Sequence, residues 1–182
     1  MQVQTPYEQA ITKKYPEQVV IAIAKDRQGK YNPITLGWAM ITSHQPPMMA
    51  ISIGLTRHSL GAIRTARGFV ISFPSSEMGE EALFHGTRSG RDMDKLSEFG
   101  SKTQPASVID CVLLADAVAN FECKLESELE TGDHVLFVGR VVCSHVNQDS
   151  NVRRLYTVGE EYQMGGVVRV QNGSRRRSTP CS

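Results

Sequence analysis

Residues 117–143 read AVANFECKLESELETGDHVLFVGRVVC, and the pattern of this stretch decides the fold class. Over 117–129 the odd positions are mostly small or apolar, and over 120–130 the even positions are polar or charged. A period of two indicates a strand with one buried and one solvated face. After the turn Thr131-Gly132-Asp133, residues 135–143 return as a strand that is apolar on both faces. The stretch therefore predicts a hairpin whose second strand is covered on both sides, by a barrel interior and by a helix or a second subunit.

The rest of the chain alternates short apolar runs with short helical segments. A loop is expected at Pro46-Pro47 and irregular structure over 102–110. Ser59 is a candidate N-cap, Gly68 a candidate helix stop, and Ser89-Gly-Arg-Asp92 fits a capping box. Strands are predicted over 19–25, 35–42, 49–55 and 69–73, and helices over 59–66, 75–84 and 92–99. Many strands with short inserted helices favour a mainly β fold, a closed antiparallel barrel.

Size and composition suit one domain. The chain has 182 residues and a mass of 20.1 kDa, with 40% hydrophobic and 21% charged residues. This length allows a substantial core. We expect a single domain over 1–160 and a partly disordered extension over 161–182, where Arg175-Arg176-Arg177 lies in a polar tail.

Charge and targeting signals narrow the class of partner and the compartment. The formal net charge of +1 gives no reason to expect nucleic acid or an anionic membrane as partner. No apolar run reaches the roughly 20 residues that span a bilayer, and the N-terminus lacks the features of a signal peptide. A cytoplasmic protein is therefore expected.

Four cysteines, at 111, 123, 143 and 181, show no CxxC spacing. Cys123 and Cys143 fall within predicted strands, where cysteine behaves as a small apolar residue. Neither a disulfide nor a metal site is expected.

Residues that can carry chemistry gather between Asn32 and Pro74. Gly37, in Thr35-Leu-Gly37-Trp38, marks either a close approach of a ligand or a barrel bend beside a core Trp38. Arg57 and Ser59 stand where a strand meets a helix, so they form either an anion site or an ordinary cap beside a surface arginine. Ser52 is a hydroxyl in an apolar strand and needs a partner.

Two further positions have two interpretations each. Lys95, preceded by Ser89, brings positive charge to the same anion or lies on a solvated helix face. His134, after the hairpin turn, contacts a second anionic substrate or is exposed. The remaining histidines, including His85 and His145, have no partner at a catalytic or metal-binding spacing. No hydrolase pattern and no GxGxxG motif stands out.

Taken in order, these pieces resemble the flavin reductase-like family, which includes the flavoredoxins. The resemblance covers residues 19–146. It rests on Asn32-x-x-Thr35-x-Gly37-Trp38, Pro46-Pro47, Ile51-Ser52-Ile53, Arg57-His58-Ser59-x-x-x-Ile63, Phe69-Val-Ile-Ser-Phe-Pro74, Ser89-Gly90-Arg91-Asp92-x-Asp94-Lys95 and Gly132-Asp133-His134-x-x-Phe137-x-Gly139.

The resemblance implies a homodimer of FMN-binding split barrels, antiparallel and Greek-key-like with short inserted helices. It places FMN near the subunit interface and His134 on the nicotinamide side. It assigns the isoalloxazine and ribityl contacts to Asn32, Thr35, Gly37, Trp38, Ser52 and Ile53, and the phosphate to Arg57, His58 and Ser59, with Lys95 and Ser89 closing over it. Many relatives carry threonine at the position of Ser59, which keeps the hydroxyl. Beyond Val146 nothing aligns, and this leaves the electron donor open.

The implied function is that of an NAD(P)H-dependent flavin reductase-like oxidoreductase, in which the flavin does the chemistry and no catalytic side chain is required. One alternative is a flavoredoxin-like electron carrier reduced by another protein. A second is a flavin-free barrel acting as an interaction module. The sequence does not choose between NADH and NADPH and does not identify the final electron acceptor. It also leaves open whether FMN is a tightly bound cofactor or an exchangeable substrate.

Overall fold

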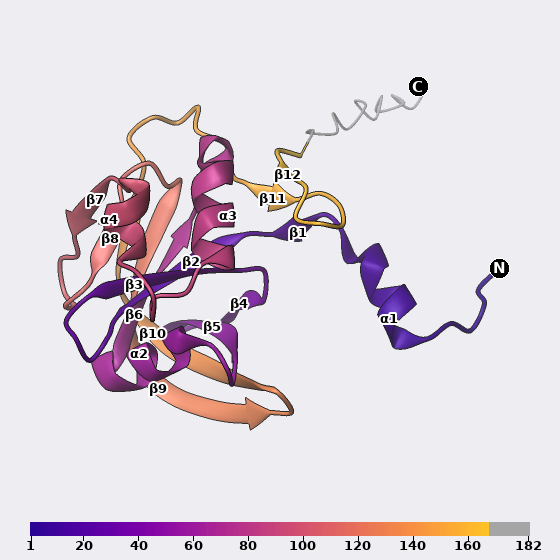
Figure 1. Cartoon of the computed structure of the whole chain (residues 1–182), viewed down its shortest axis with the longest axis horizontal. Coiled ribbons are helices and arrows are strands. Elements are labelled where there is room, and N and C mark those ends of the chain that lie inside the picture. Colours follow the sequence, from indigo (N-terminus) through magenta and orange to yellow (C-terminus); the bar gives the residue numbers. More distant parts are fainter. Residues whose placement is uncertain (168–182) are drawn as a thin grey trace, which may run out of the picture.

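A computed structural model describes residues 1–167 of the chain (Figure 1). The helices are α1 (Tyr7–Ala10), α2 (His58–Ala66), α3 (Gly79–Thr87) and α4 (Lys95–Phe99), with 3₁₀ turns at Ile11–Lys14 and Ser76–Met78. The strands are β1 (Glu17–Gln18), β2 (Val20–Lys25), β3 (Tyr31–Leu36), β4 (Ala39–His44), β5 (Pro47–Gly54), β6 (Gly68–Phe73), β7 (Thr103–Pro105), β8 (Val112–Leu114), β9 (Ala119–Thr131), β10 (His134–Val146), β11 (Tyr156–Thr157) and β12 (Met164–Gly165). The basic run at 175–177 and Cys181 lie outside the described residues.

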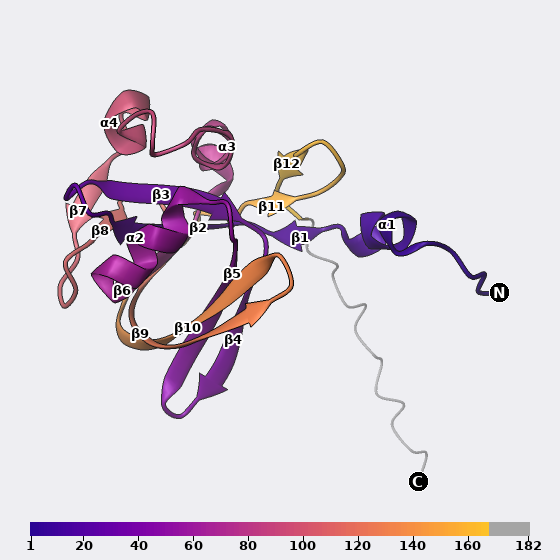
Figure 2. The ribbon, with the colours of Figure 1, turned by 60° about the horizontal axis from the view of Figure 1, so that its bottom comes forward.

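One antiparallel sheet of seven strands, in the order β3-β2-β6-β9-β10-β5-β4, dominates the fold. The sheet curls so that β4 and β5 come round toward β2 and β3 (Figure 2). Its edge strands, β3 and β4, are joined only through Gly37 and Trp38 and do not pair with each other. The mainly β, antiparallel prediction is confirmed, but strand pairing does not close the barrel within the described residues.

The predicted hairpin is confirmed as β9 and β10, with Gly132 at a φ of 61° in the turn. Val135 and Phe137 are fully buried, whereas Leu136 and Val138 on the other face of β10 are half-buried. Gly139 is required here, because a Cβ would lie 2.8 Å from both Cys123 Cβ and Phe69 Cζ.

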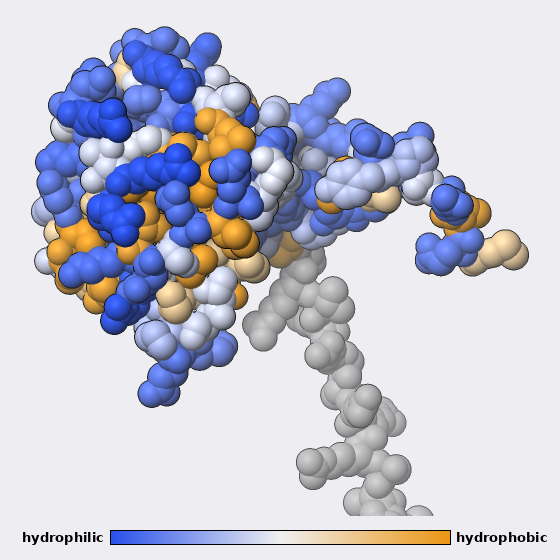
Figure 3. Space-filling view, turned by 90° about the horizontal axis from the view of Figure 1, so that it is seen from below, coloured by the Kyte–Doolittle hydropathy of each residue, from blue (hydrophilic) through white to orange (hydrophobic). Residues whose placement is uncertain are grey.

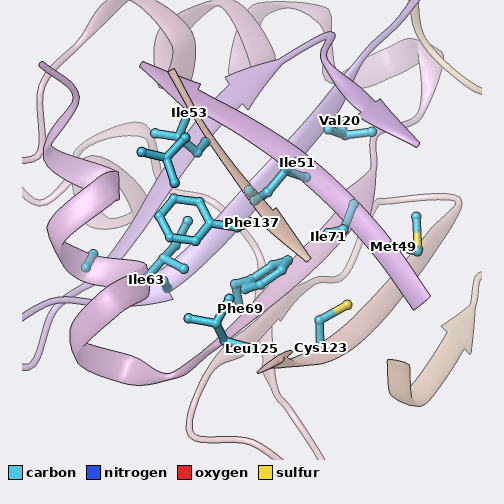
Figure 4. Close-up of a cluster of buried hydrophobic side chains, with 14 residues drawn as sticks. Val20, Met49, Ile51, Ile53, Ile63, Phe69, Ile71, Cys123, Leu125 and Phe137 are labelled. Carbon is cyan, nitrogen blue, oxygen red and sulfur yellow. The ribbon is translucent and has the colours of Figure 1, made fainter. Parts of the chain in front are cut away.

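Two clusters form the core, one on each face of β2 and β6. The inner cluster fills the curled sheet, around the fully buried rings of Phe69 and Phe137, and Ile63 of α2 packs into it (Figure 4). The outer cluster joins Ile21 and Val70 to α3, β8 and Leu155. Replacing either inner phenylalanine with alanine removes contacts worth about 3–5 kcal/mol. These two clusters hold β2, β3, α2 and α3 in fixed positions around the site.

The termini form a separate small sheet. Glu17 of β1 pairs with Thr157 of β11, and β11 pairs with β12, so a segment near the start of the chain meets one near residue 160 beside α3 (Figure 1). Across the described residues, no helix combines the length and apolar character that a membrane crossing requires.

Several local predictions are wrong. The strand expected over 35–42 is interrupted at Gly37-Trp38, and Trp38 is 48% exposed rather than in the core. Ser59 lies inside α2, whose N-cap is Arg57, and α2 ends at Arg67 in the left-handed region (φ 55°) rather than at Gly68.

The predicted capping box at Ser89 is also wrong. Ser89 Oγ accepts from the Arg91 backbone N–H, and α4 begins later, at Lys95. Its cap is Asp94, which accepts from the Ser97 N–H at 3.2 Å. The three-residue spacing from cap to donor that starts a helix is therefore found at Asp94 and not at Ser89.

Candidate functional site

A cavity of about 340 Å³ opens where β3 passes into β4, between the end of β5, α3 and the terminal sheet. It brings together the sequence-predicted residues Thr35, Gly37, Trp38, Ser52, Ile53, Arg57 and His134. Thr35 is fixed by a hydrogen bond from its hydroxyl to the Ala82 carbonyl of α3, at 2.6 Å. We call this space the larger cavity.

An aromatic pair stands at the larger cavity. The rings of Trp38 and His134 lie with centroids 4.6 Å apart and planes tilted by 41°. His134 Nδ1 is 2.6 Å from Asp133 Oδ1, which fixes the imidazole and leaves Nε2 close to Gly54. The planar surface of the pair and its half-exposed position suit contact with another flat aromatic group.

Gly37 allows a close approach that, with any larger residue here, would require the Glu17 carboxylate to move. A Cβ at this position would lie 2.6 Å from the carboxyl carbon of Glu17, which is itself paired with Lys14 at 2.6 Å. Lys14 Nζ also lies 6.0 Å from the Trp38 ring. The glycine therefore lets the β1 segment close over the β3–β4 junction, rather than bending a continuous strand.

A smaller cavity, of about 140 Å³, lies at the start of α2. It brings together the other predicted residues, Asn32, His58, Ser59, Ser89 and Lys95, again with Arg57. The two cavities adjoin, because Ile34, Arg57, Gly86 and Thr87 line both.

The smaller cavity is strongly cationic. Arg57, Arg88, Arg91 and Lys95 line it together with two histidines, and no aspartate or glutamate is among its lining residues. Arg91 is positioned by a hydrogen bond from its guanidinium to the Thr56 carbonyl at 3.1 Å. Such a concentration of donors at a helix start is typical of an anion site.

Lys95 is the most buried of these cations, at 3% exposure. Its ammonium donates to the carbonyls of His85 and Arg88, at 2.9 and 3.3 Å, at the end of α3. An ammonium has three donors, so one is left for another acceptor. Burial, reinforced by the charge of Arg57, lowers the pKa of Lys95 to about 8. The reading of Lys95 as a solvated helix residue is therefore wrong.

Ser59 and Asn32 form a buried polar pair across the smaller cavity. Asn32 Nδ2 donates to Ser59 Oγ at 2.7 Å, while Asn32 Oδ1 is buried with no hydrogen-bond partner in the described residues. His58 Nε2 faces Asp26 Oδ2 at 3.4 Å. An unpaired buried acceptor is costly, which makes Asn32 Oδ1 a candidate to accept a hydrogen bond from a ligand.

Sequence reasoning missed the mouth of the larger cavity. Lys14, Tyr15 and Glu17 reach it from the N-terminal segment, and Thr157, Tyr162 and Met164 from the C-terminal one. No local motif marks these positions. Gly86 carries a faint signal, as a helical glycine, and a Cβ there would lie 3.3 Å from Thr35 Cβ.

Comparison with known proteins gives a family and a fold. Residues 12–166 match the family model described as flavin reductase like domain. An uncharacterized protein of Archaeoglobus fulgidus is 29% identical over 62% of this chain and 64% of its own length. The NADH-dependent FMN reductase AsuE2 of Streptomyces nodosus subsp. asukaensis is 34% identical over 59% of this chain and 57% of its own. The matches thus span less than two thirds of both relatives.

Among solved structures, the flavoredoxin of Methanosarcina acetivorans superposes with a TM-score of 0.84 at 18% identity, over 97% of each chain. At this identity the likeness concerns the fold alone, and it confirms the split-barrel prediction.

Proposed function

This chain belongs to the flavin reductase like family, and from that premise we propose that its two adjoining cavities bind FMN and that it acts as an NAD(P)H-dependent flavin reductase-like oxidoreductase. Family membership supports a flavin-related oxidoreductase function. The electron donor, the acceptor and the role of each residue belong to the proposal.

The observation that carries the proposal is the cationic smaller cavity. Four cationic side chains gather there without a carboxylate, directly beside a larger cavity with an aromatic pair. A molecule that is anionic at one end and flat and aromatic at the other matches both spaces. FMN has this shape, with its phosphate placed by Arg57, His58, Ser59, Ser89 and Lys95.

The polar groups between the two ends fit the same ligand. Asn32 Oδ1 has no donor among residues 1–167, and a ribityl hydroxyl is a donor of the required kind. Gly90 packs so closely on this amide that a Cβ would overlap it, which keeps the wall of the smaller cavity in place. Thr35, Gly37, Trp38, Ser52 and Ile53 would border the ring.

A bound flavin would supply the hydride and electron transfer between a nicotinamide donor and an acceptor. The protein holds the phosphate, orients the ring against the β3–β4 junction and keeps His134 beside the donor side. No side chain has to transfer a proton in this scheme. The relative AsuE2, named an NADH-dependent FMN reductase, supports the choice of a nicotinamide donor.

The direct test is reconstitution with FMN, followed by anaerobic mixing with NADH and, separately, NADPH. Rapid bleaching of the flavin absorbance with either donor is the expected result. Tight FMN binding with slow bleaching by both donors would instead indicate an electron carrier reduced by another protein. A colourless protein that cannot be reconstituted would contradict FMN binding and favour a flavin-free interaction module.

We also propose that the chain is a homodimer. Its β4 strand exposes Met40 by 52% and Ile41 by 63%, and Leu129 of β9 is 61% exposed. Seen from below, the molecule shows hydrophobic surface among hydrophilic residues (Figure 3). Patches of this kind mark interaction sites, and a second copy would also cover the half-buried face of β10.

Light scattering tests the dimer, with an expected mass of twice 20.1 kDa. The substitution Ile41→Lys should shift the equilibrium to the monomer by placing a charge in the contact. A monomeric wild type at micromolar concentration, with FMN bound, would contradict the dimer.

A further inference from the structure

Three side chains with different metal-binding atoms meet on the outer face of the β9–β10 hairpin. They are Glu122, Cys143 and His145, and their ligand atoms all lie within 4.8 Å of one another. None of the three lines the larger or the smaller cavity. The cluster is therefore separate from the proposed flavin site.

A β-bulge creates this cluster. Val141 pairs with Cys123, but the next pair along the hairpin is Cys143 with Glu122, so Val142 is an extra residue. Without the bulge, Cys143 would point to the inner face. With it, Cys143 stands directly opposite Glu122 on the outer face, and His145, two residues on, shares that face.

The carboxylate of Glu122 is held in a fixed orientation. Its Oε1 accepts from the Ser107 N–H at 2.8 Å, and its Oε2 accepts from Val108 and Ile109 at 2.8 and 3.0 Å. A carboxylate has about four lone-pair sites, so one remains, on Oε1. His145 Nε2 faces Oε1 at 2.7 Å.

The donor set selects the kind of ion. One carboxylate oxygen, one imidazole nitrogen and one thiolate sulfur suit Zn²⁺, while Ca²⁺ and Mg²⁺ prefer oxygen alone. Three protein ligands with a fourth position open to water form a recognised Zn²⁺ arrangement. The backbone hydrogen bonds on Glu122 supply the outer support that metal-binding carboxylates require.

We propose that Glu122 Oε1, Cys143 Sγ and His145 Nε2 bind one Zn²⁺ ion per chain, with a fourth position open to solvent. To admit the ion, His145 must move back from Glu122, because two ligands of a tetrahedral ion lie about 3.3 Å apart. Its side chain is 27% exposed, so it has room for this shift. Without metal, His145 and Glu122 share only a hydrogen bond.

The test uses the tag-free chain carrying Cys181→Ser, so that this thiol cannot supply a ligand. Burial raises the pKa of the Cys111 and Cys123 thiols to about 12, which makes them poor competitors for metal. Zn²⁺ is titrated against a chromophoric chelator, and Co²⁺ replaces it for spectroscopy. We expect one Zn²⁺ per chain with a dissociation constant below about 1 μM. A thiolate-to-cobalt charge-transfer band should accompany Co²⁺ binding.

Cys143→Ser should abolish the band and weaken Zn²⁺ binding at least about 100-fold, and His145→Gln should weaken it about 10- to 100-fold or more. His44→Gln, at an exposed histidine, is the matched control and should change neither measurement. The melting temperature and FMN content of each variant confirm that it has folded. Absence of Zn²⁺ binding by the parent chain, or affinity unchanged in both ligand variants, would overturn the proposal and leave a purely structural hydrogen bond.

Discussion

Lys95 in the smaller cavity and Glu122 behind the β9–β10 hairpin are both almost fully buried charges, but their surroundings differ sharply. Lys95 faces two neutral carbonyls and the like charge of Arg57, and its pKa falls to about 8. Burial alone would raise the pKa of Glu122, yet His145 and three backbone N–H groups lower it to about 2. The fold therefore opposes the charge of Lys95 and supports that of Glu122.

This difference separates a buried charge that the fold leaves without an opposite charge from one that the fold already supports. A buried charge that folding leaves uncompensated is a cost that a ligand of opposite charge can repay. A compensated charge has its partners already and contributes to stability. Each of the following substitutions tests one side of the contrast.

The largest expected effect comes from Glu122→Gln, which deprives the 107–109 loop of its carboxylate acceptor. Leaving buried N–H groups unsatisfied should lower the free energy of unfolding by about 2–4 kcal/mol. Urea denaturation in the presence of EDTA measures this without a contribution from metal. Glu130→Gln, at an exposed position of the same strand, should stay within about 0.5 kcal/mol. Equal stability of the two variants would remove the structural role of Glu122.

Arg57→Ala tests the cationic smaller cavity, where we expect charge to serve ligand binding rather than stability. Losing a charge-assisted hydrogen bond to phosphate costs about 1.5–3 kcal/mol, so FMN affinity should fall roughly 10- to 100-fold while stability is kept. Arg64→Ala, on the exposed side of the same helix, serves as the control. An unchanged dissociation constant in a fluorescence titration would exclude Arg57 from the site.

Lys95 predicts a pH dependence of FMN binding. A phosphate favours the charged ammonium, which the free protein loses as pH rises through about 8. FMN affinity should therefore decline above pH 8, by at most about tenfold per pH unit. In Lys95→Met it should be weaker and level over the same range. A level profile in the wild type would show that Lys95 does not face the phosphate.

The stability of the protein without FMN should depend on pH in the opposite direction. Between the folded-state pKa of about 8 and the ordinary lysine pKa of 10.5, unfolded Lys95 holds a proton that folded Lys95 has released. The free energy of unfolding of the unliganded chain should therefore rise with pH across this window. The same measurement on Lys95→Met shows how much of the rise comes from Lys95.

The smallest effect is expected for His134→Ala. Its ring packs against Trp38 at the larger cavity, with the two planes tilted by 41°. Losing one contact of about 0.7–1.4 kcal/mol should raise the Michaelis constant for NAD(P)H about three- to tenfold, with turnover and FMN content nearly unchanged. If the chain is a carrier, neither constant should change. A lower melting temperature together with loss of FMN would indicate a structural role instead.

The parts of the fold that follow from local pattern were predictable. The period of two found the β9–β10 hairpin, and the polar residues at the strand-to-helix junction marked Arg57, His58 and Ser59. All twelve predicted site residues line the two cavities. Their contacts with FMN and nicotinamide stay a prediction.

What the sequence could not show depends on distant segments. Alternation assigned Glu122 to the solvated face, because nothing in β9 reveals that residues 107–109 cover it. The bulge at Val142 is equally hidden, and it makes Cys143 a neighbour of Glu122 instead of a core residue. The sequence also allowed Trp38 to be a core residue, because nothing local shows that the strand breaks at Gly37.

The pairing of Glu17 with Thr157 also affects the order in which parts of the molecule fold. The mouth of the larger cavity needs residues from both ends of the described chain, so it cannot form while the chain is still being synthesised up to β10. Closing so long a loop is entropically slow compared with forming the neighbouring hairpins. The curled sheet can assemble first, and the mouth of the larger cavity is completed as a late step of folding.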